Sequence, residues 1–387
     1  MVSPQQTHEP KQPAKRGLYL FGHDLRLEDN PALNHLISQC DDVLFVYLLN
    51  PELTKASHHG FPRLGEHRWQ FIWQCLRDLN QHLQRFGHAL HLIQGNPDKA
   101  IPPLIEKHRI ELLAGSYNSG LQESLFWQAL QKQAECQVVT LHQNSLFTPQ
   151  HLPVSVDKIP KQFTPFRKLA EEQLVPDPVT LNARLAQTKP IIVAEDAGAW
   201  PETPPLLSDY QQTSSHQERP IQGGCEAAWN HLDHFIWKSR AIDHYKQTRN
   251  SLDVVQQPDH VSLLSGWLAQ GCLSGRQVWS EISRYEQQFG ANESTYWLKF
   301  ELLWREFFYW NAHRLQADLY RFGGERRKKP LTSFYPQRFK SWCEGSTAHP
   351  LVNACMKQLK ATGMLSNRGR QIVASALVNE LQLDWRY

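Results

Sequence analysis

Five short apolar runs divide the first 142 residues, and stretches with helical spacing lie between them. The runs cover residues 17–21, 43–49, 90–93, 112–114 and 138–141. A strand that is apolar along its whole length is buried on both faces, and alternation of such strands with helices is typical of a parallel sheet covered on both sides. The sequence therefore predicts a doubly wound parallel α/β domain over residues 17–142.

Helix signals separate these runs. Asn30 is predicted to cap a helix that has Pro31 at its first position, where a missing N–H costs little. Helical spacing of apolar residues recurs over residues 69–86 and 122–134. No glycine-rich loop follows the first run, so no dinucleotide site of that kind is predicted in this domain.

The rest of the chain divides into three parts. Residues 1–16 are polar and contain proline, which is typical of a disordered tail. Residues 143–220 hold many prolines and polar runs, which indicates a surface connector with one helix near residues 166–172. Helical periodicity dominates residues 221–387, so an all-helical domain is predicted there.

Positive charge and tryptophan are concentrated in the second half of the chain. Residues 221–387 carry 21 Lys and Arg against 15 Asp and Glu, whereas residues 1–220 carry 20 against 23. Nine of the 13 Trp also lie in the second half. A basic, Trp-rich domain suits an anionic partner, although a randomly charged surface explains the charge alone equally well.

The seven cysteines have neither zinc-site spacing nor the pattern of a disulfide framework. No metal site is therefore predicted, and a reducing, cytoplasmic location is expected. The N-terminus lacks the apolar stretch of a signal peptide, and no apolar run is long enough to cross a membrane.

A polar stripe runs through the most apolar helical segment, for which Ser294 is the predicted cap. Its members share one helical face: Trp297, Glu301, Trp304, Arg305 and Phe308. Glu301 and Arg305 have the spacing of an ion pair within one helix, so a buried pair is one interpretation. The other is a pocket with a polar floor and an aromatic platform on which a base could stack.

Two further constellations allow a structural and a functional interpretation. Tyr245 and Arg249 are four residues apart, and Ser262 and Ser265 precede a helix, which suits either an anion site or ordinary capping. Near the C-terminus, Asn367 and Arg370 share a face beside small residues. An Asn amide can pair with the edge of a heteroaromatic ligand, but a tightly packed helix with a solvated Arg is the alternative.

The order of these motifs resembles the photolyase/cryptochrome family over nearly the whole chain. The similarity is carried by LFGHDLRLEDNPAL near the N-terminus, by LLSGWLAQGCLSGRQVW, FELLWREFF and WCEGSTAHPLVNACMKQLKATG, and by NRGRQIVAS near the C-terminus. FELLWREFF and SNRGRQIVAS are most similar to the DASH branch of cryptochromes. The resemblance implies that the helical domain binds FAD.

The resemblance also implies roles for individual residues. Flavin and phosphate contacts fall on Tyr245, Val261, Ser262, Leu263, Leu264, Ser265, Glu301, Arg305, Asn367 and Arg370. Asn367 would face the reactive edge of the isoalloxazine, Glu301 would bind the adenine side and the damaged base, and Trp304 would stack on a flipped pyrimidine dimer. DNA contacts fall on Arg249, Trp304, Arg305, Phe308 and Arg368, and Trp385 matches a distal member of the electron-donor chain.

The implied activity is blue-light repair of cyclobutane pyrimidine dimers, mainly in single-stranded DNA, by electron transfer from reduced FAD. A folate antenna (methenyltetrahydrofolate) is implied in the α/β domain, with contacts around residues 118–124. Two alternatives remain at this point: a flavin photoreceptor or regulator without repair, and a remnant unable to hold FAD.

Three departures from the family pattern bear on these expectations. Gly22 and His23 replace a Phe-Arg pair, and Val261 and Leu263 replace polar residues of the phosphate loop. The sequence ends at Tyr387, whereas the family continues through residues that contact flavin and donate electrons to it. The helical domain is therefore expected to be incomplete at its C-terminus, with its open side covered by a partner or a second copy.

Overall fold

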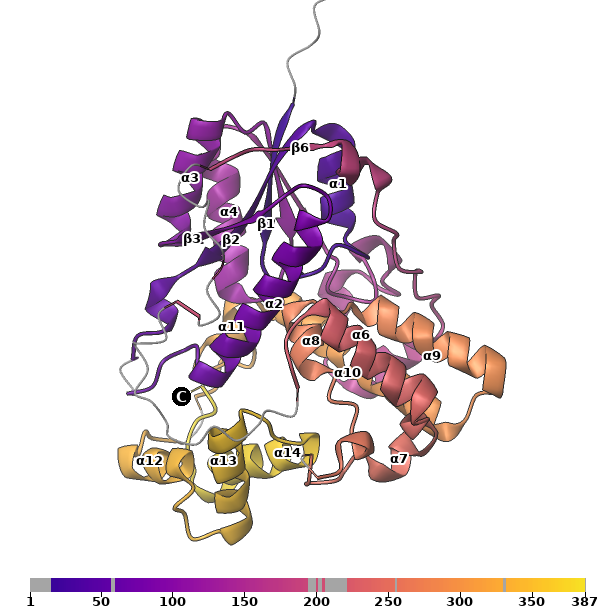
Figure 1. Ribbon diagram of the computed structural model, residues 1–387. Helices are drawn as coiled ribbons and strands as arrows, with labels where there is room; N and C mark the ends of the chain where they lie inside the picture. The colour runs from indigo at the N-terminus through magenta and orange to yellow at the C-terminus, as the bar shows by residue number, and fades with distance from the viewer. Residues whose placement is uncertain are drawn as a thin grey trace, which may run out of the picture.

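A computed structural model describes residues 15–56, 60–193, 200, 204–205, 221–254, 256–329 and 332–386, without the side chains of residues 97 and 98. Figure 1 shows the parallel sheet at one end of the molecule and helices of the second half of the chain at the other. In the described part of the chain, no helix combines the length and the apolar character that a membrane span requires.

The sheet contains all five predicted strands, and they are parallel in the order β3-β2-β1-β4-β5. They are β1 (Arg16–Phe21), β2 (Asp42–Leu49), β3 (Leu90–Gln94), β4 (Leu112–Ser116) and β5 (Gln137–Leu141). A two-residue strand that was not predicted, β6 (Lys189–Pro190), comes from the connector and pairs with β2. The connector therefore contributes to the sheet as well as crossing the surface.

Side-chain alternation along the strands explains why both faces of the sheet are covered. Tyr19 and Phe45 pack on one face with helices α1 (Pro31–Gln39) and α2 (Glu66–Gln84). Leu18 and Leu44 pack on the other face with α3 (Pro97–His108) and α4 (Leu121–Gln133). The predicted doubly wound α/β architecture is thus confirmed (Figure 1).

Local signals explain most helix boundaries in this domain. Asn30 caps α1 through its side chain, which accepts from the Leu33 amide, and Pro31 is the first helical residue, as predicted. Helix α4 (Leu121–Gln133) lies close to its predicted position. Helix α3 (Pro97–His108) was not predicted, because Pro102 and Pro103 lie inside it and internal prolines normally interrupt a helix.

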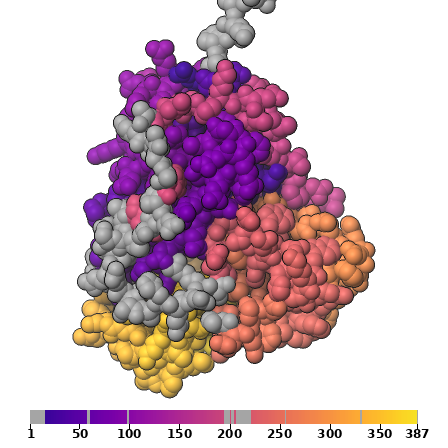
Figure 2. All heavy atoms as spheres, viewed as in Figure 1, coloured from indigo at the N-terminus to yellow at the C-terminus, as the bar shows by residue number. Residues whose placement is uncertain are grey.

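The second half of the chain is helical, as predicted. The connector helix is α5 (Phe163–Glu171), and the later helices are α6 (Cys225–Asp233), α7 (Tyr245–Thr248), α8 (Ser265–Gln270), α9 (Gly275–Phe289), α10 (Glu293–Leu315), α11 (Ala317–Tyr320), α12 (Pro336–Glu344), α13 (Pro350–Thr362) and α14 (Asn367–Ser375). On the face drawn in Figure 2, these later segments form the lower part of the surface, beneath the α/β domain.

Helix α10 begins earlier than its sequence pattern suggested. Asn292 caps it, and the side chains of Asn292 and Thr295 form a reciprocal capping box. The prediction of Ser294 as the cap was wrong. The Ser294 hydroxyl instead accepts a hydrogen bond from the Lys246 amide at 3.1 Å, and this contact fixes α7 against α10.

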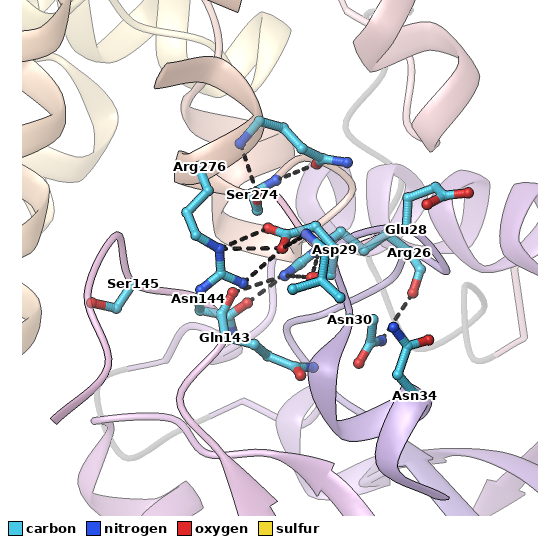
Figure 3. A network of polar contacts seen from close by, with 12 residues as sticks. Arg26, Glu28, Asp29, Asn30, Asn34, Gln143, Asn144, Ser145, Ser274 and Arg276 are labelled. Atoms are coloured by element: carbon cyan, nitrogen blue, oxygen red, sulfur yellow. Dashed lines mark hydrogen bonds and ion pairs between the residues drawn. The ribbon is translucent and has the colours of Figure 1, made fainter. Parts of the chain in front are cut away.

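A buried ion pair joins the two halves of the chain (Figure 3). Arg276, near the start of α9, binds Asp29 in the loop before α1, with 2.9 Å between Nη2 and Oδ1. Their side chains are 3% and 0% exposed. Arg26 donates to the backbone carbonyls of Asp29, Gly271 and Gln143 at 2.8–3.0 Å. The α/β domain, the connector and the helical region therefore meet at one network.

We predict that Asp29→Asn lowers the free energy of unfolding by about 3–5 kcal/mol, because it leaves Arg276 buried without its countercharge. Asn tolerates the positive φ of 48° at this position, so the backbone need not change. Urea denaturation measures the effect. The matched control is Asp41→Asn, which breaks an exposed pair with Arg184 and should cost less than about 1 kcal/mol. Equal losses in both variants would contradict the prediction.

Candidate functional site

A pocket lies where α7, the segment leading into α8, and the beginning of α14 meet. Its cavity volume is about 160 Å³. It is lined by Tyr245, Arg249, Val254, Val261, Ser262, Leu263, Leu264, Ser265, Met364, Leu365, Ser366, Asn367 and Arg370. Every predicted flavin contact except Glu301 and Arg305 belongs to this set. Segments far apart in the sequence therefore converge as the resemblance implied, although their binding of flavin remains a prediction.

The segment before α8 has an unusual backbone. Leu263 has a φ of 51°, in the left-handed region that residues other than glycine seldom adopt. Ser262 is anchored on one side of this turn, because its carbonyl lies 2.9 Å from Nε2 of His231. Strained residues of this kind are common where a loop clamps a ligand. The turn holds Ser262 and Ser265 at the pocket wall.

Two arginines make the pocket electropositive. Arg249 donates from Nη1 to Glu301 at 2.7 Å, and its guanidinium lies 4.7 Å from the centre of the Trp297 ring. Its Nε is buried and has no hydrogen-bond partner among the described residues. Arg370 donates from Nε to the Leu365 carbonyl at 3.1 Å, and within the described part of the chain its other guanidinium donors are left for a ligand.

These donors fit the phosphates of a nucleotide cofactor such as FAD. Two guanidinium groups, one of which includes the unpaired Nε of Arg249, and two serine hydroxyls are groups that recognise phosphate oxygens. The cavity is smaller than the roughly 300–1,000 Å³ of ligand pockets, so it accommodates part of a dinucleotide rather than the whole molecule.

Glu301 reaches the pocket through Arg249 and does not pair with Arg305. The predicted alternative of a Glu301–Arg305 ion pair is therefore wrong. Burial raises the pKa of Glu301, and the charge of Arg249 opposes that rise. Arg305 instead contacts the connector and α8, because it donates to the Asn144 carbonyl at 2.5 Å and to the Leu268 carbonyl at 3.3 Å.

Two aromatic rings stack against Trp304, so it is not presented as a bare platform. Phe163 from α5 stacks on its ring with 3.6 Å between centroids and 11° between planes. Phe308 stacks at 5.5 Å and is itself 62% exposed. Sequence spacing gave no sign of Phe163, because that residue lies in the connector. Phe163 therefore occupies one face of the ring on which a base was expected to stack.

The remaining predicted residues lie apart from the pocket wall. Arg368 is exposed and donates to Asn250 at 3.0 Å. Trp385 is 50% exposed, with its ring 6.5 Å from that of Tyr320.

Glu306, the fully buried carboxylate of α10, was not predicted from the sequence. It accepts hydrogen bonds from Ser145 at 2.5 Å and from the Trp310 indole at 3.3 Å, and burial raises its pKa. A charged residue between Arg305 and Phe307 in an apolar helix was the available signal.

A second and larger pocket lies at the carboxyl ends of β1, β2 and β4, with a volume of about 410 Å³. Such crevices form where the strand order reverses, and they commonly bind ligands in α/β proteins. Asn118, Gln122 and Glu123, from the segment expected to contact an antenna, line it with His23. His23 lies 3.7 Å from Glu123, and this polar neighbour lowers the pKa of the carboxyl.

Comparison with known proteins gives a consistent assignment. Residues 17–183 match the DNA photolyase family, and residues 297–387 match the FAD binding domain of DNA photolyase. Cryptochrome DASH of Idiomarina loihiensis is 38% identical over 96% of this chain and 80% of its own length. Cryptochrome DASH of Vibrio parahaemolyticus is 39% identical, again over 96% of this chain and 80% of its own length.

Solved structures agree with these matches. The crystal structure of a Synechocystis cryptochrome superposes with a TM-score of 0.86 at 32% identity, over 97% of this chain and 77% of that one. A class III photolyase from Agrobacterium tumefaciens shares the fold, with a TM-score of 0.76 at 23% identity over 98% of this chain and 76% of that one. The chain therefore belongs to the photolyase/cryptochrome family, in which it resembles the DASH cryptochromes.

Proposed function

We propose that this protein binds FAD in the helical region and repairs cyclobutane pyrimidine dimers under blue light, mainly in single-stranded DNA. The observation that carries the proposal is the convergence of Arg249, the 261–265 segment, Asn367 and Arg370 on one electropositive pocket. The pocket is joined to Glu301 through Arg249. The match of residues 297–387 to the FAD binding domain of DNA photolyase supports the choice of cofactor.

The chain's own residues would bind, orient and desolvate. Arg249 and Arg370 would neutralise the cofactor phosphates, and Ser262 and Ser265 would donate hydroxyl hydrogen bonds to them. The Asn367 amide can donate and accept at the edge of a heteroaromatic ring. Bound FAD, when reduced and excited by light, would supply the electron that splits the dimer and would take it back afterwards.

Substrate would reach this site by base flipping, a step that photolyases as a class use. Glu301, whose pKa is raised by burial, would share a proton or hydrogen bond with a damaged base. Trp304 would stack on the flipped dimer after displacement of exposed Phe308. Arg305 and Arg368 would add positive charge along the approach, which makes binding salt-dependent.

One observation favours a second candidate, a flavin photoreceptor without repair. Phe163 covers Trp304 at 3.6 Å, so the ring on which a dimer would stack is already in use. A receptor needs no substrate platform, and the same flavin pocket would serve it. The repair and photoreceptor functions therefore make different demands on Trp304 but the same demands on the flavin pocket.

We propose that the pocket at the ends of β1, β2 and β4 holds an antenna chromophore of the folate type. Its volume of about 410 Å³ is within the usual range for a small-molecule ligand. Arg63 and Arg68 line it and suit the carboxylates of a folate tail. Gly22 leaves open space near the first strand, where no atom lies within 4 Å of an added Cβ.

Arg249→Ala should weaken FAD binding by about 10- to 100-fold, because charge-assisted hydrogen bonds contribute roughly 1.5–3 kcal/mol each. Reconstitution with FAD, followed by the absorption spectrum of the desalted protein, measures retention. Arg321→Ala is the matched control, because Arg321 is exposed and pairs only with Asp318 among the described residues. If the parent chain retains no flavin after reconstitution, the proposed function fails.

Trp304→Ala should weaken binding of a dimer-containing oligothymidine by about 5- to 150-fold, because base stacking on an aromatic ring contributes roughly 1–3 kcal/mol. Loss of dimers under blue light, compared with a dark sample, measures repair. Trp279→Phe serves as the control, because Trp279 belongs neither to the pocket nor to the polar stripe. A flavin-loaded parent that leaves the dimers intact in light would favour the photoreceptor instead.

A further inference from the structure

Three buried cysteines gather between the α/β domain and the helical region, together with a carboxylate and a histidine. Cys75, Asp78 and His82 occupy one face of α2, at positions i, i+3 and i+7. Cys225 is the first residue of α6, and Cys272 lies in the turn between α8 and α9. All three thiols are free and buried.

The candidate ligand atoms lie close together. His82 Nδ1 is 3.7 Å from Asp78 Oδ2, and with Cys225 Sγ these atoms all lie within 4.8 Å of one another. Cys272 extends the group, because its thiol interacts with the thiols of both Cys225 and Cys75. Their spacing along the sequence gave no sign of this group, because three separate segments supply its members.

Two glycines make the close approach of these segments possible. A Cβ on Gly223 would lie 2.3 Å from the Phe71 carbonyl oxygen, and one on Gly224 would lie 2.9 Å from Asp78. Gly224 also has a φ of 117°, which side chains rarely permit. The chain can therefore enter α6 directly against α2, where the Cys225 amide donates to Asp78 at 2.8 Å.

We propose that Asp78, His82, Cys225 and Cys272 bind a divalent metal ion of the zinc class. Zinc–ligand bonds of about 2.0–2.3 Å in a tetrahedron place ligand atoms roughly 3.3–3.8 Å apart. The observed separation of 3.7 Å between His82 and Asp78 meets this requirement, and the 4.8 Å limit for the trio requires only a small contraction. Thiolate and imidazole ligands favour zinc over magnesium or calcium.

Charge balance and access support the same assignment. Two thiolates and one carboxylate would supply three negative charges. A divalent ion and the neighbouring Arg26 guanidinium would supply three positive charges, so the cluster would have no net charge. A cavity of about 500 Å³, lined by His82, Cys225, Cys272 and the acidic residues Glu28 and Glu226, gives an ion a route to the cluster. The Cys225 thiol donates to the Leu25 carbonyl at 3.1 Å and would lose this proton on binding.

Cobalt titration of the reduced, desalted protein tests the proposal, because Co²⁺ occupies zinc sites and its tetrahedral ligand-field bands lie at longer wavelengths than flavin absorption. We expect one Co²⁺ per chain, displaced by Zn²⁺. Cys225→Ser and His82→Gln should each weaken binding by at least about tenfold. Cys355→Ser is the matched control, because Cys355 is a buried thiol in a different cluster, with Val352 and Met356, and it should bind like the parent.

The His82 variant keeps the test informative if a cysteine variant misfolds, because the His82 side chain is 21% exposed. Circular dichroism establishes folding before each titration. Absence of stoichiometric cobalt, or equal uptake by the parent, Cys225→Ser and His82→Gln, would overturn the proposal. So would mass spectrometry of the unreduced protein that found Cys225 and Cys272 joined in a disulfide, with two fewer free thiols than the seven in the sequence.

Discussion

The buried Asp29–Arg276 pair is the interaction on which the arrangement of the two halves depends. Removing two charges from water costs several kcal/mol for each ion, and the cost is offset only when the geometry is close and the remaining donors are satisfied. Here Asp29 also accepts from the Val179 amide at 2.9 Å, and Arg26 fills its own donors with backbone carbonyls. An alternative docking of the halves would leave one of these charges unpaired. The network therefore selects one relative position, which places α9 and the neighbouring α10 against the connector.

With the two halves docked in this way, successive residues of helix α10 contact different neighbours. Trp304 stacks on Phe163, Arg305 holds the Asn144 carbonyl, and Glu306 accepts from Ser145. All three partners belong to the connector or its border with the sheet. The charged and aromatic residues of this motif thus fix the connector, while Glu301, one turn earlier, is the member that meets the pocket through Arg249. A substitution among residues 304–306 would disturb the connector even where it also removed a ligand contact.

The strands could be predicted because burial on both faces favours apolar residues throughout a short run, as in β2. Helix α3 was not predicted because it contains internal prolines. Strand β6 was not predicted because two residues are too few to show an alternating pattern. The pocket was anticipated through resemblance, which joined segments that no local rule connects. Two contacts changed the interpretation. Phe163 and Trp304 are more than a hundred residues apart in the sequence, and Arg249 and Glu301 are about fifty apart. Helical spacing says which residues share a face but not which distant residue meets that face.

The short helix α8 connects the two sites that the structure suggests. Ser265 begins it at the wall of the electropositive pocket, and Cys272 follows its end in the thiol cluster. Gly271 closes the helix with a φ of 73° and lies against the backbone of His23, so the far end of α8 is seated directly on the α/β domain. A metal ion on Cys272 would restrict that end further. The strained turn at Leu263 precedes the first residue of α8. This turn would then lose fewer conformations when an anionic ligand ordered it. Coupling of this kind needs no displacement of the backbone, since a reduction of conformational freedom at one end lowers the entropic cost of binding at the other.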